Sequence, residues 1–182
     1  MDAAGWTISI IAIGIALVIV VRMELGVRRT SVARAAGGRR GHAGGEVYEF
    51  MSPSWVRMAK REIVAALEPR DLDVEPFTLS EEFTDPPPHL ADDAEVIGFA
   101  IHVGAGSVEV LEGPAPDADV RIISDYTDAL EVARDPGADA TDPVETGRRV
   151  AEGRLRIVGD PTSAPPVLHE VDIHRLLAEH TA

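Results

Sequence analysis

The chain has 182 residues, a formal net charge of -14 and no cysteine. This length allows one ordinary domain with an appendage, and the absence of cysteine excludes disulfides, thiolate zinc sites and cysteine nucleophiles. The charge is uneven, because residues 1–45 carry six arginines against Asp2 and Glu24, whereas residues 46–182 have a net charge of -18. A domain this acidic repels phosphates, so we expect no nucleic-acid partner.

An uncharged apolar segment of 19 residues, rich in Ile, Val and Leu, covers residues 3–21 (AAGWTISIIAIGIALVIVV). As a helix it would span about 28 Å, close to the roughly 30 Å of a bilayer's hydrocarbon core. Trp6 and Arg22 suit the two interfaces, and the segment lacks the basic residues that precede the apolar part of a signal peptide. We therefore expect a retained transmembrane anchor with a basic flank over residues 1–27.

The six arginines of residues 1–45 all follow the apolar segment. The positive-inside rule then predicts a single-pass protein of the cell membrane with its C-terminal domain in the cytoplasm. Residues 28–45 (RRTSVARAAGGRRGHAGG) have almost no apolar periodicity and are expected to form a flexible linker. Its arginines either contact anionic headgroups or serve as a topology signal alone, and both interpretations remain open.

The pattern of a folded α+β domain begins at residue 46. Helical spacing of apolar residues predicts helices over 54–67, 125–134, 142–151 and 167–179. Alternating or β-branched runs predict strands at 96–103, 107–111, 119–124 and 154–158, with a further strand around Phe77 and Leu79 within 74–84. Residues 85–90 (DPPPHL) are expected to form a rigid extended connection.

Capping residues mark the expected helix starts. Ser52 or Ser54 precedes the first helix, with Pro53 near its first turn, and Ser124 or Asp125 precedes the second. Asp142 begins the third helix and is followed by a proline at the first helical position. Gly153 is expected to end that helix just before the strand at 154–158.

The turn GAGS, residues 104–107, joins two expected strands, so a hairpin is predicted there rather than a phosphate-binding loop. Alternation along this hairpin and the following strand places seven apolar side chains on one buried face of a sheet: Phe99, Ile101, Val103, Val108, Val110, Val120 and Ile122. In the strand at 154–158, Leu155 and Ile157 alternate inward and leave Arg154 and Arg156 on the other face.

The order of these elements resembles the sterol carrier protein type 2 (SCP-2) lipid-binding domain family over roughly residues 50–180. The resemblance rests on Ala118-Asp119-Val120 leading into a strand and then a helix near Asp125, and on the stretch GRLRIVGD at residues 153–160. That stretch matches the family's pattern of Gly, a basic residue, two alternating hydrophobic residues and a final Gly-Asp. The start SPSW at residues 52–55 is similar to the opening of bacterial members.

The resemblance implies an antiparallel sheet of about five strands with helices over one face and an apolar tunnel between them. It also implies non-catalytic binding or transfer of an acyl chain, acyl-CoA, sterol or other lipid, although the fold serves as an accessory domain in some enzymes. The family has no compact ligand signature to carry over. The expected apolar lining is therefore the inward set of Phe99, Ile101, Val103, Val108, Val110, Val120, Ile122, Leu130, Leu155 and Ile157, and Arg154 and Arg156 are candidate contacts for an anionic headgroup.

The sequence offers no catalytic or metal-binding constellation. His169 and His174 are five residues apart, about 140° around a helix, so they do not share a face as a helical metal pair would. No G-x-S-x-G elbow and no nucleotide-binding phosphate loop occurs. We therefore expect no catalytic residue, no metal and no cofactor.

Two functional hypotheses remain open from the sequence. The first is a membrane-tethered lipid-binding domain whose membrane contact is through residues 3–21. The second is a membrane-anchored interaction module with a filled core and an acidic recruiting surface. A third and weaker hypothesis is an accessory subunit of a lipid-metabolising enzyme. Ligand identity, protein partners and homodimerisation are left open.

Overall fold

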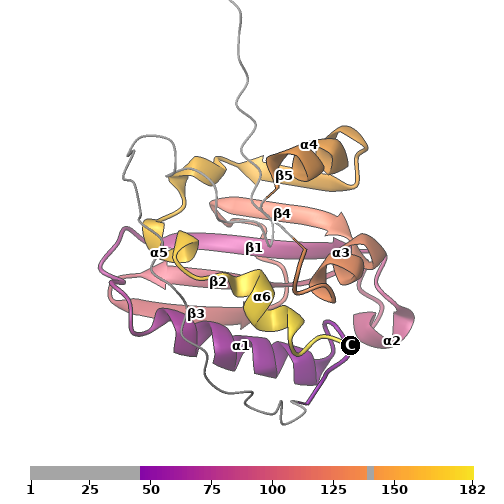
Figure 1. Cartoon of the computed structure of the whole chain (residues 1–182), viewed down its shortest axis with the longest axis horizontal. Coiled ribbons are helices and arrows are strands. Elements are labelled where there is room, and N and C mark those ends of the chain that lie inside the picture. Colours follow the sequence, from indigo (N-terminus) through magenta and orange to yellow (C-terminus); the bar gives the residue numbers. More distant parts are fainter. Residues whose placement is uncertain (1–45, 139–141) are drawn as a thin grey trace, which may run out of the picture.

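The computed structural model describes residues 46–138 and 142–182 (Figure 1). The predicted anchor (1–27) and linker (28–45) lie outside the described residues. Among the helices that are described, none combines the length and the apolar character needed to cross a membrane. The predicted domain at 46–182 folds as α+β, with helices packed on a five-stranded sheet.

The sheet has the strand order β3-β2-β1-β4-β5. Its strands are β1 (Phe77–Thr84), β2 (Val96–Gly104), β3 (Ser107–Glu112), β4 (Val120–Asp125) and β5 (Leu155–Gly159). Neighbouring strands are antiparallel except for β1 and β4, which run parallel at the centre. The prediction of five strands is confirmed, but the prediction of an antiparallel sheet is wrong. The chain leaves β3 at one edge and crosses to β4 through residues 113–119, so β4 comes to lie beside β1 in the same direction.

Helices α1 (Pro53–Leu67), α3 (Tyr126–Ala133) and α6 (Ile173–Ala178) lie over one face of the sheet (Figure 1). The capping signals are confirmed. The Ser52 hydroxyl accepts from the Trp55 N–H at the start of α1, and the Asp125 carboxylate accepts from two N–H groups of α3. Helix α4 (Pro143–Ala151), capped by Asp142, lies beside β5.

Two local predictions are wrong. The expected helix over 167–179 is divided into α5 (Pro166–His169) and α6, because Asp172 accepts from the Arg175 N–H and starts a new helix there. The expected extended connection at 85–90 leads into a single helical turn, α2 (Pro88–Ala91). Its first residue is a proline, whose fixed φ suits the first turn of a helix.

The register confirms the predicted apolar face. Val103 pairs with Val108 and Ile101 with Val110 across the hairpin. The buried face of the sheet is completed by Phe99, Val120 and Ile122, and all seven predicted side chains belong to the core cluster or pack against it. Phe50, just before α1, adds an aromatic centre whose ring lies 4.9 Å from Trp55 and 5.1 Å from Phe83.

The two ends of the described domain are joined. Tyr48 forms an isolated parallel bridge with Thr181. The Tyr48 N–H donates to the His180 carbonyl and the Ala182 N–H donates to the Tyr48 carbonyl, each at 2.8 Å. The C-terminal segment that carries α6 is therefore fixed beside the chain that leads into α1.

Candidate functional site

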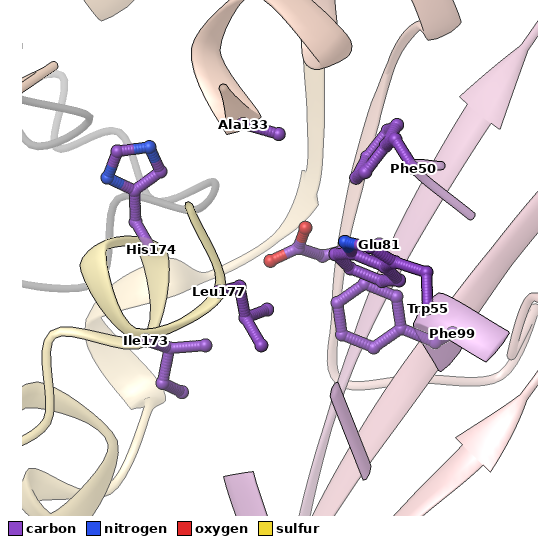
Figure 2. Close-up of a pocket in the computed structure, with 8 residues that line it drawn as sticks. All are labelled: Phe50, Trp55, Glu81, Phe99, Ala133, Ile173, His174 and Leu177. Atoms are coloured by element: carbon purple, nitrogen blue, oxygen red, sulfur yellow. The ribbon is translucent and has the colours of Figure 1, made fainter. Parts of the chain in front are cut away.

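A small pocket lies between the helix-covered face of the sheet and helices α1, α3 and α6 (Figure 2). Its walls are mainly apolar, and the volume open to a water-sized sphere is about 10 Å³. That is close to the smallest space that holds one water molecule. Eight residues line it: Phe50, Trp55, Glu81, Phe99, Ala133, Ile173, His174 and Leu177.

Glu81 contributes the one carboxyl group of this lining. It lies on the central strand β1, opposite Phe99 of β2 and Ile122 of β4. Figure 2 shows the carboxyl group directed from the sheet into the space beside Leu177 and Ala133. Burial, at 5% exposure, raises the pKa of Glu81 to about 8, because a charged carboxylate loses its hydration there. At neutral pH the pocket therefore contains mostly the uncharged acid.

Helix α6 closes the pocket on the side away from the sheet, and hydrogen bonds hold it in place. The His174 Nε2 lies 2.9 Å from the Val132 carbonyl oxygen of α3. Because a carbonyl only accepts, this nitrogen carries the proton. The Trp55 indole N–H donates to the Thr181 hydroxyl at 2.9 Å, and that hydroxyl donates to the Leu177 carbonyl at 2.9 Å. The helix is thus tied to both α3 and α1.

The opposite face of the sheet contains a different carboxyl environment. Arg121 of β4 donates two hydrogen bonds to Glu82, each at 2.7 Å, and the Ser80 hydroxyl donates a third at 3.1 Å. The crossing segment 113–119 covers this cluster, since the Ala115 N–H donates to the Ser80 hydroxyl at 3.0 Å. The Arg121 guanidinium lowers the pKa of Glu82 despite burial of the carboxyl. This network is a structural ion pair.

The predicted lining residues lie in the core or pack against it, but only one of them lines the pocket. Phe99 lines it. Six others are buried in the surrounding core (Ile101, Val103, Val110, Val120, Ile122 and Leu155), and three are half-buried beside it (Val108, Leu130 and Ile157). Their contact with a ligand stays a prediction.

Sequence reasoning missed Glu81 as part of the site. Its neighbours along the strand alternate as Phe77, Leu79, Glu81 and Phe83, and this period of two places Glu81 on the apolar face. The alternation thus indicated a buried position for Glu81. The adjacent Ser80 and Glu82, however, give the stretch a polar composition that is typical of an exposed segment. From the sequence, His174 was considered as half of a metal pair and as an i, i+4 partner of Glu170, and not as part of a pocket. In the described part of the chain, no three His, Asp or Glu side chains gather closely enough to hold a metal.

The two candidate headgroup arginines are placed differently. Arg154 lies just before β5 and pairs with Glu152, and its guanidinium reaches Asp128 of α3 at 3.4 Å. Arg156 is exposed and lies opposite Ile123, in the register row that also contains Glu82. Neither arginine lines the pocket described above. Their contact with an anionic headgroup stays a prediction.

A second, open depression of about 390 Å³ lies between α3 and the start of α4. Four acidic side chains line it, together with a single arginine, Arg149. The acidic residues are Glu131, Asp135, Asp142 and Glu145. This depression is wide and polar where the first pocket is narrow and apolar.

The chain matches no family model and no curated protein. It is similar to several solved structures. The crystal structure of sterol carrier protein 2 shares 17% identity, with 73% of this chain and 100% of that chain covered, at a TM-score of 0.45. A conserved protein from Thermus thermophilus, described as a candidate sterol carrier protein, shares 16% identity over 78% of this chain and 96% of its own, at a TM-score of 0.46.

A third similar structure is UbiJ-SCP2, a ubiquinone synthesis protein. It shares 17% identity over 69% of this chain and 96% of its own, at a TM-score of 0.40. Membership of the SCP-2 family stays a prediction for this chain.

Proposed function

We propose that residues 46–182 bind or transfer an apolar small molecule between the sheet and α6, without covalent chemistry on it. The ligand class is a fatty acyl chain, an acyl-CoA, a sterol or another lipid. The observation that carries this proposal is the apolar pocket of Phe50, Trp55, Phe99 and Leu177 between two layers of the fold. Ligand pockets of proteins are typically apolar and contain few polar groups, and this one fits that description.

A lipid needs far more room than about 10 Å³, so binding requires α6 to move away from the sheet. This helix has six residues and is held by side-chain hydrogen bonds from His174 and Thr181, and the two backbone hydrogen bonds of the Tyr48–Thr181 bridge hold the residues that follow it. Breaking each such bond costs about 1 kcal/mol. A dozen buried methylene groups contribute roughly 10 kcal/mol at about 0.8 kcal/mol each. The apolar gain thus exceeds the cost of those bonds.

The second part of the proposal is a tether. Residues 3–21 would anchor the chain in the cell membrane, and residues 28–45 would leave the acidic domain within roughly 20 to 25 Å of the cytoplasmic surface by the random-coil rule. A tether of this length keeps the pocket at high effective concentration beside a lipid source.

An interaction module is the second candidate function. Two observations favour it: the pocket is nearly filled, and the depression beside α4 gathers Glu131, Asp135, Asp142 and Glu145. A partner would present a basic surface to this depression, because opposite charges guide association.

Photolabelling of the full chain in phosphatidylcholine vesicles tests the first function. The probes are a 16-carbon alcohol and a sterol, each with a photoactivatable diazirine. We expect labelled peptides from β2 and α6, and unchanged probe recovered from unirradiated samples. Ala133→Leu, which fills the pocket, should abolish this labelling, whereas Ala65→Leu on the exposed side of α1 should not. Labelling confined to residues 3–21 would favour the interaction module.

A further inference from the structure

Helix α6 covers the pocket, and its two ends are held in different ways. At its start the chain makes a tight turn between α5 and α6, in which the Ile173 N–H donates to the Val171 carbonyl at 3.0 Å. Asp172, the central residue of this turn, has a φ of -80° and a ψ of 79°, close to the values of an inverse γ-turn. Hinges in proteins are commonly a few residues at the end of an element, so this turn is a candidate hinge for α6.

The chain before this turn is fixed to the domain. Val167 and Leu168 of α5 are buried in the core cluster. The Arg70 guanidinium donates to the Glu170 carboxylate at 2.8 Å, two residues before the centre of the turn. A rotation at Asp172 would therefore move α6 and leave α5 in place.

The residues that follow α6 belong to the same segment as the helix. The His180 N–H and the Thr181 hydroxyl both donate to the Leu177 carbonyl, at 3.0 and 2.9 Å. The Thr181 N–H donates to the Ala178 carbonyl at 3.3 Å. Leu177 also lines the pocket (Figure 2). A displacement of the pocket wall at Leu177 therefore acts directly on Thr181.

At this end the segment is fastened to the chain around Tyr48 and α1. The Tyr48 N–H donates to the His180 carbonyl, and the Ala182 N–H donates to the Tyr48 carbonyl. The Trp55 indole adds a side-chain bond to Thr181 at 2.9 Å. Tyr48 lies outside the five strands of the sheet, and its pairing with Thr181 is an isolated bridge. This pairing can separate without breaking any ladder of the sheet.

We propose that residues 46–48 are a latch for the pocket. While Tyr48 is paired with Thr181, α6 stays over the pocket, and a ligand enters when this pairing separates and α6 turns about Asp172. The inference rests on the proposed lipid-binding function and adds the step that controls access to its site. Access then depends on the segment that leads into α1 and not on opening of the sheet.

A disulfide between positions 48 and 181 tests this control. The chain has no cysteine, so Tyr48→Cys combined with Thr181→Cys introduces the one thiol pair of the protein. Neighbouring strands lie about 4.8 Å apart, within the Cα separation of roughly 4.4 to 6.8 Å that disulfides span.

The full chain in phosphatidylcholine vesicles is labelled with the diazirine-bearing 16-carbon alcohol, once oxidised and once reduced. Peptides from β2 and α6 are quantified by mass spectrometry. We expect oxidation to lower their labelling at least about tenfold, since a disulfide commonly favours the cross-linked state by more than this factor. Reduction of the same sample should restore the labelling, which controls for the loss of the Tyr48 and Thr181 side chains.

Hydrogen exchange of the α6 amides reports the same opening without a ligand. Ala182→Pro removes the N–H that donates to the Tyr48 carbonyl. It should accelerate α6 exchange about fivefold, the change that one hydrogen bond of ordinary net strength implies. Ala182→Gly keeps the N–H and should exchange as the unmodified protein does.

A second disulfide controls for the effect of cross-linking itself. His102→Cys with Glu109→Cys joins β2 to β3 at residues that lie opposite each other in the hairpin. Its oxidation should change neither the labelling of the pocket nor the exchange of α6. A cooperative thermal transition in each variant establishes that the domain is folded.

The outcomes separate this inference from the function on which it rests. Labelling and α6 exchange that are the same with the 48–181 pair oxidised or reduced would overturn the latch and leave apolar ligand binding intact. Equal acceleration of exchange in β1, β4 and α6 by Ala182→Pro would also overturn it, because the domain would then open as a whole. Slower α6 exchange on oxidation, with no pocket labelling in any sample, would remove the proposed function while the control of α6 by Tyr48 stands.

Discussion

Glu81 and Glu82 are consecutive residues of the central strand with the same side chain, and both are almost fully buried at 5% and 3% exposure. The strand directs them to opposite faces of the sheet. On the helix-covered face, burial raises the pKa of Glu81 to about 8. On the other face, Arg121 lowers the pKa of Glu82. One step along the backbone thus separates a neutral acid from an anion.

The difference shows that burial alone does not decide the charge of a carboxyl group. Both groups lose hydration, but the Arg121 guanidinium offers Glu82 two hydrogen bonds in a bidentate arrangement. Glu81 instead lies in a pocket whose described lining contains no basic residue other than a histidine engaged elsewhere. The Arg121–Glu82 pair therefore belongs to the structural part of the sheet, whereas Glu81 is a buried acid that lines the small pocket.

The largest effect on stability is expected from removing Arg121, the cation that pairs with Glu82. Arg121→Met leaves Glu82 buried without its partner, which should lower the free energy of unfolding at pH 7 by about 3 to 5 kcal/mol. Urea denaturation measures this change. Arg121 lowers the pKa of Glu82, so the ionised Glu82 stabilises the fold above its ordinary pKa of 4.5 and loses this effect at lower pH. The difference in unfolding free energy between the variant and the unmodified protein should therefore shrink as the pH falls below 4.5.

A double variant controls for packing. Glu82→Leu combined with Arg121→Met replaces the pair by apolar side chains and should recover most of the loss. If the double variant is as unstable as Arg121→Met, the cluster contributes through its shape and not through its charges.

The second largest effect should be an increase in the free energy of unfolding at pH 7. Burial raises the pKa of Glu81 from 4.5 to about 8. A group with a raised pKa stabilises the folded state most at low pH, and this stabilisation is lost as the pH rises from 4.5 through about 8. Glu81→Gln removes this pH dependence. The variant should therefore match the unmodified protein near pH 4.5 and exceed it by on the order of 3 kcal/mol at pH 7, taking about 1.4 kcal/mol per pH unit.

Urea denaturation at a series of pH values checks this prediction. The difference between the two proteins should grow between pH 4.5 and 8 and then level off. A difference that is constant with pH would mean that Glu81 does not titrate in this range.

The smallest effect concerns the helix that covers Glu81. Thr181→Val removes the hydroxyl that accepts from the Trp55 indole and donates to the Leu177 carbonyl, at a cost of about 1 kcal/mol. Hydrogen exchange of the α6 amides should become several-fold faster, while that of β1 and β4 should not change. Equal acceleration in the sheet would show that α6 does not open on its own.

Local signals in the sequence predicted most elements correctly. A serine or aspartate cap next to the apolar stripe marked α1, α3 and α4, and alternation marked β2 to β5. These features depend on residues within one or two turns of each other. The parallel pairing of β1 with β4 depends on how residues 113–119 cross the sheet, and no local pattern encodes that path.

The site was harder to predict than the fold. Glu81 lies in the run Ser80-Glu81-Glu82, which by composition alone suggests solvent exposure. Its burial results from helices α1, α3 and α6 meeting above it, and Ala133 and Leu177 come from segments distant in the chain. The division of the C-terminal helix at Asp172 is equally decisive, because it separates α6 from α5 and lets α6 lie over the pocket. The burial of Glu81 therefore depends on tertiary packing, which local sequence patterns do not encode.

The bridge between Tyr48 and Thr181 has a mechanical consequence. Two backbone hydrogen bonds of 2.8 Å connect the segment before α1 to the segment that follows α6. Tension applied to the chain at residue 46 acts first on this short bridge and is passed through Thr181 to the helix above Glu81. The central strands, which are paired along their whole lengths, lie farther along that path. A pull on this end of the domain would therefore load the segment that carries α6 before it loads the central strands.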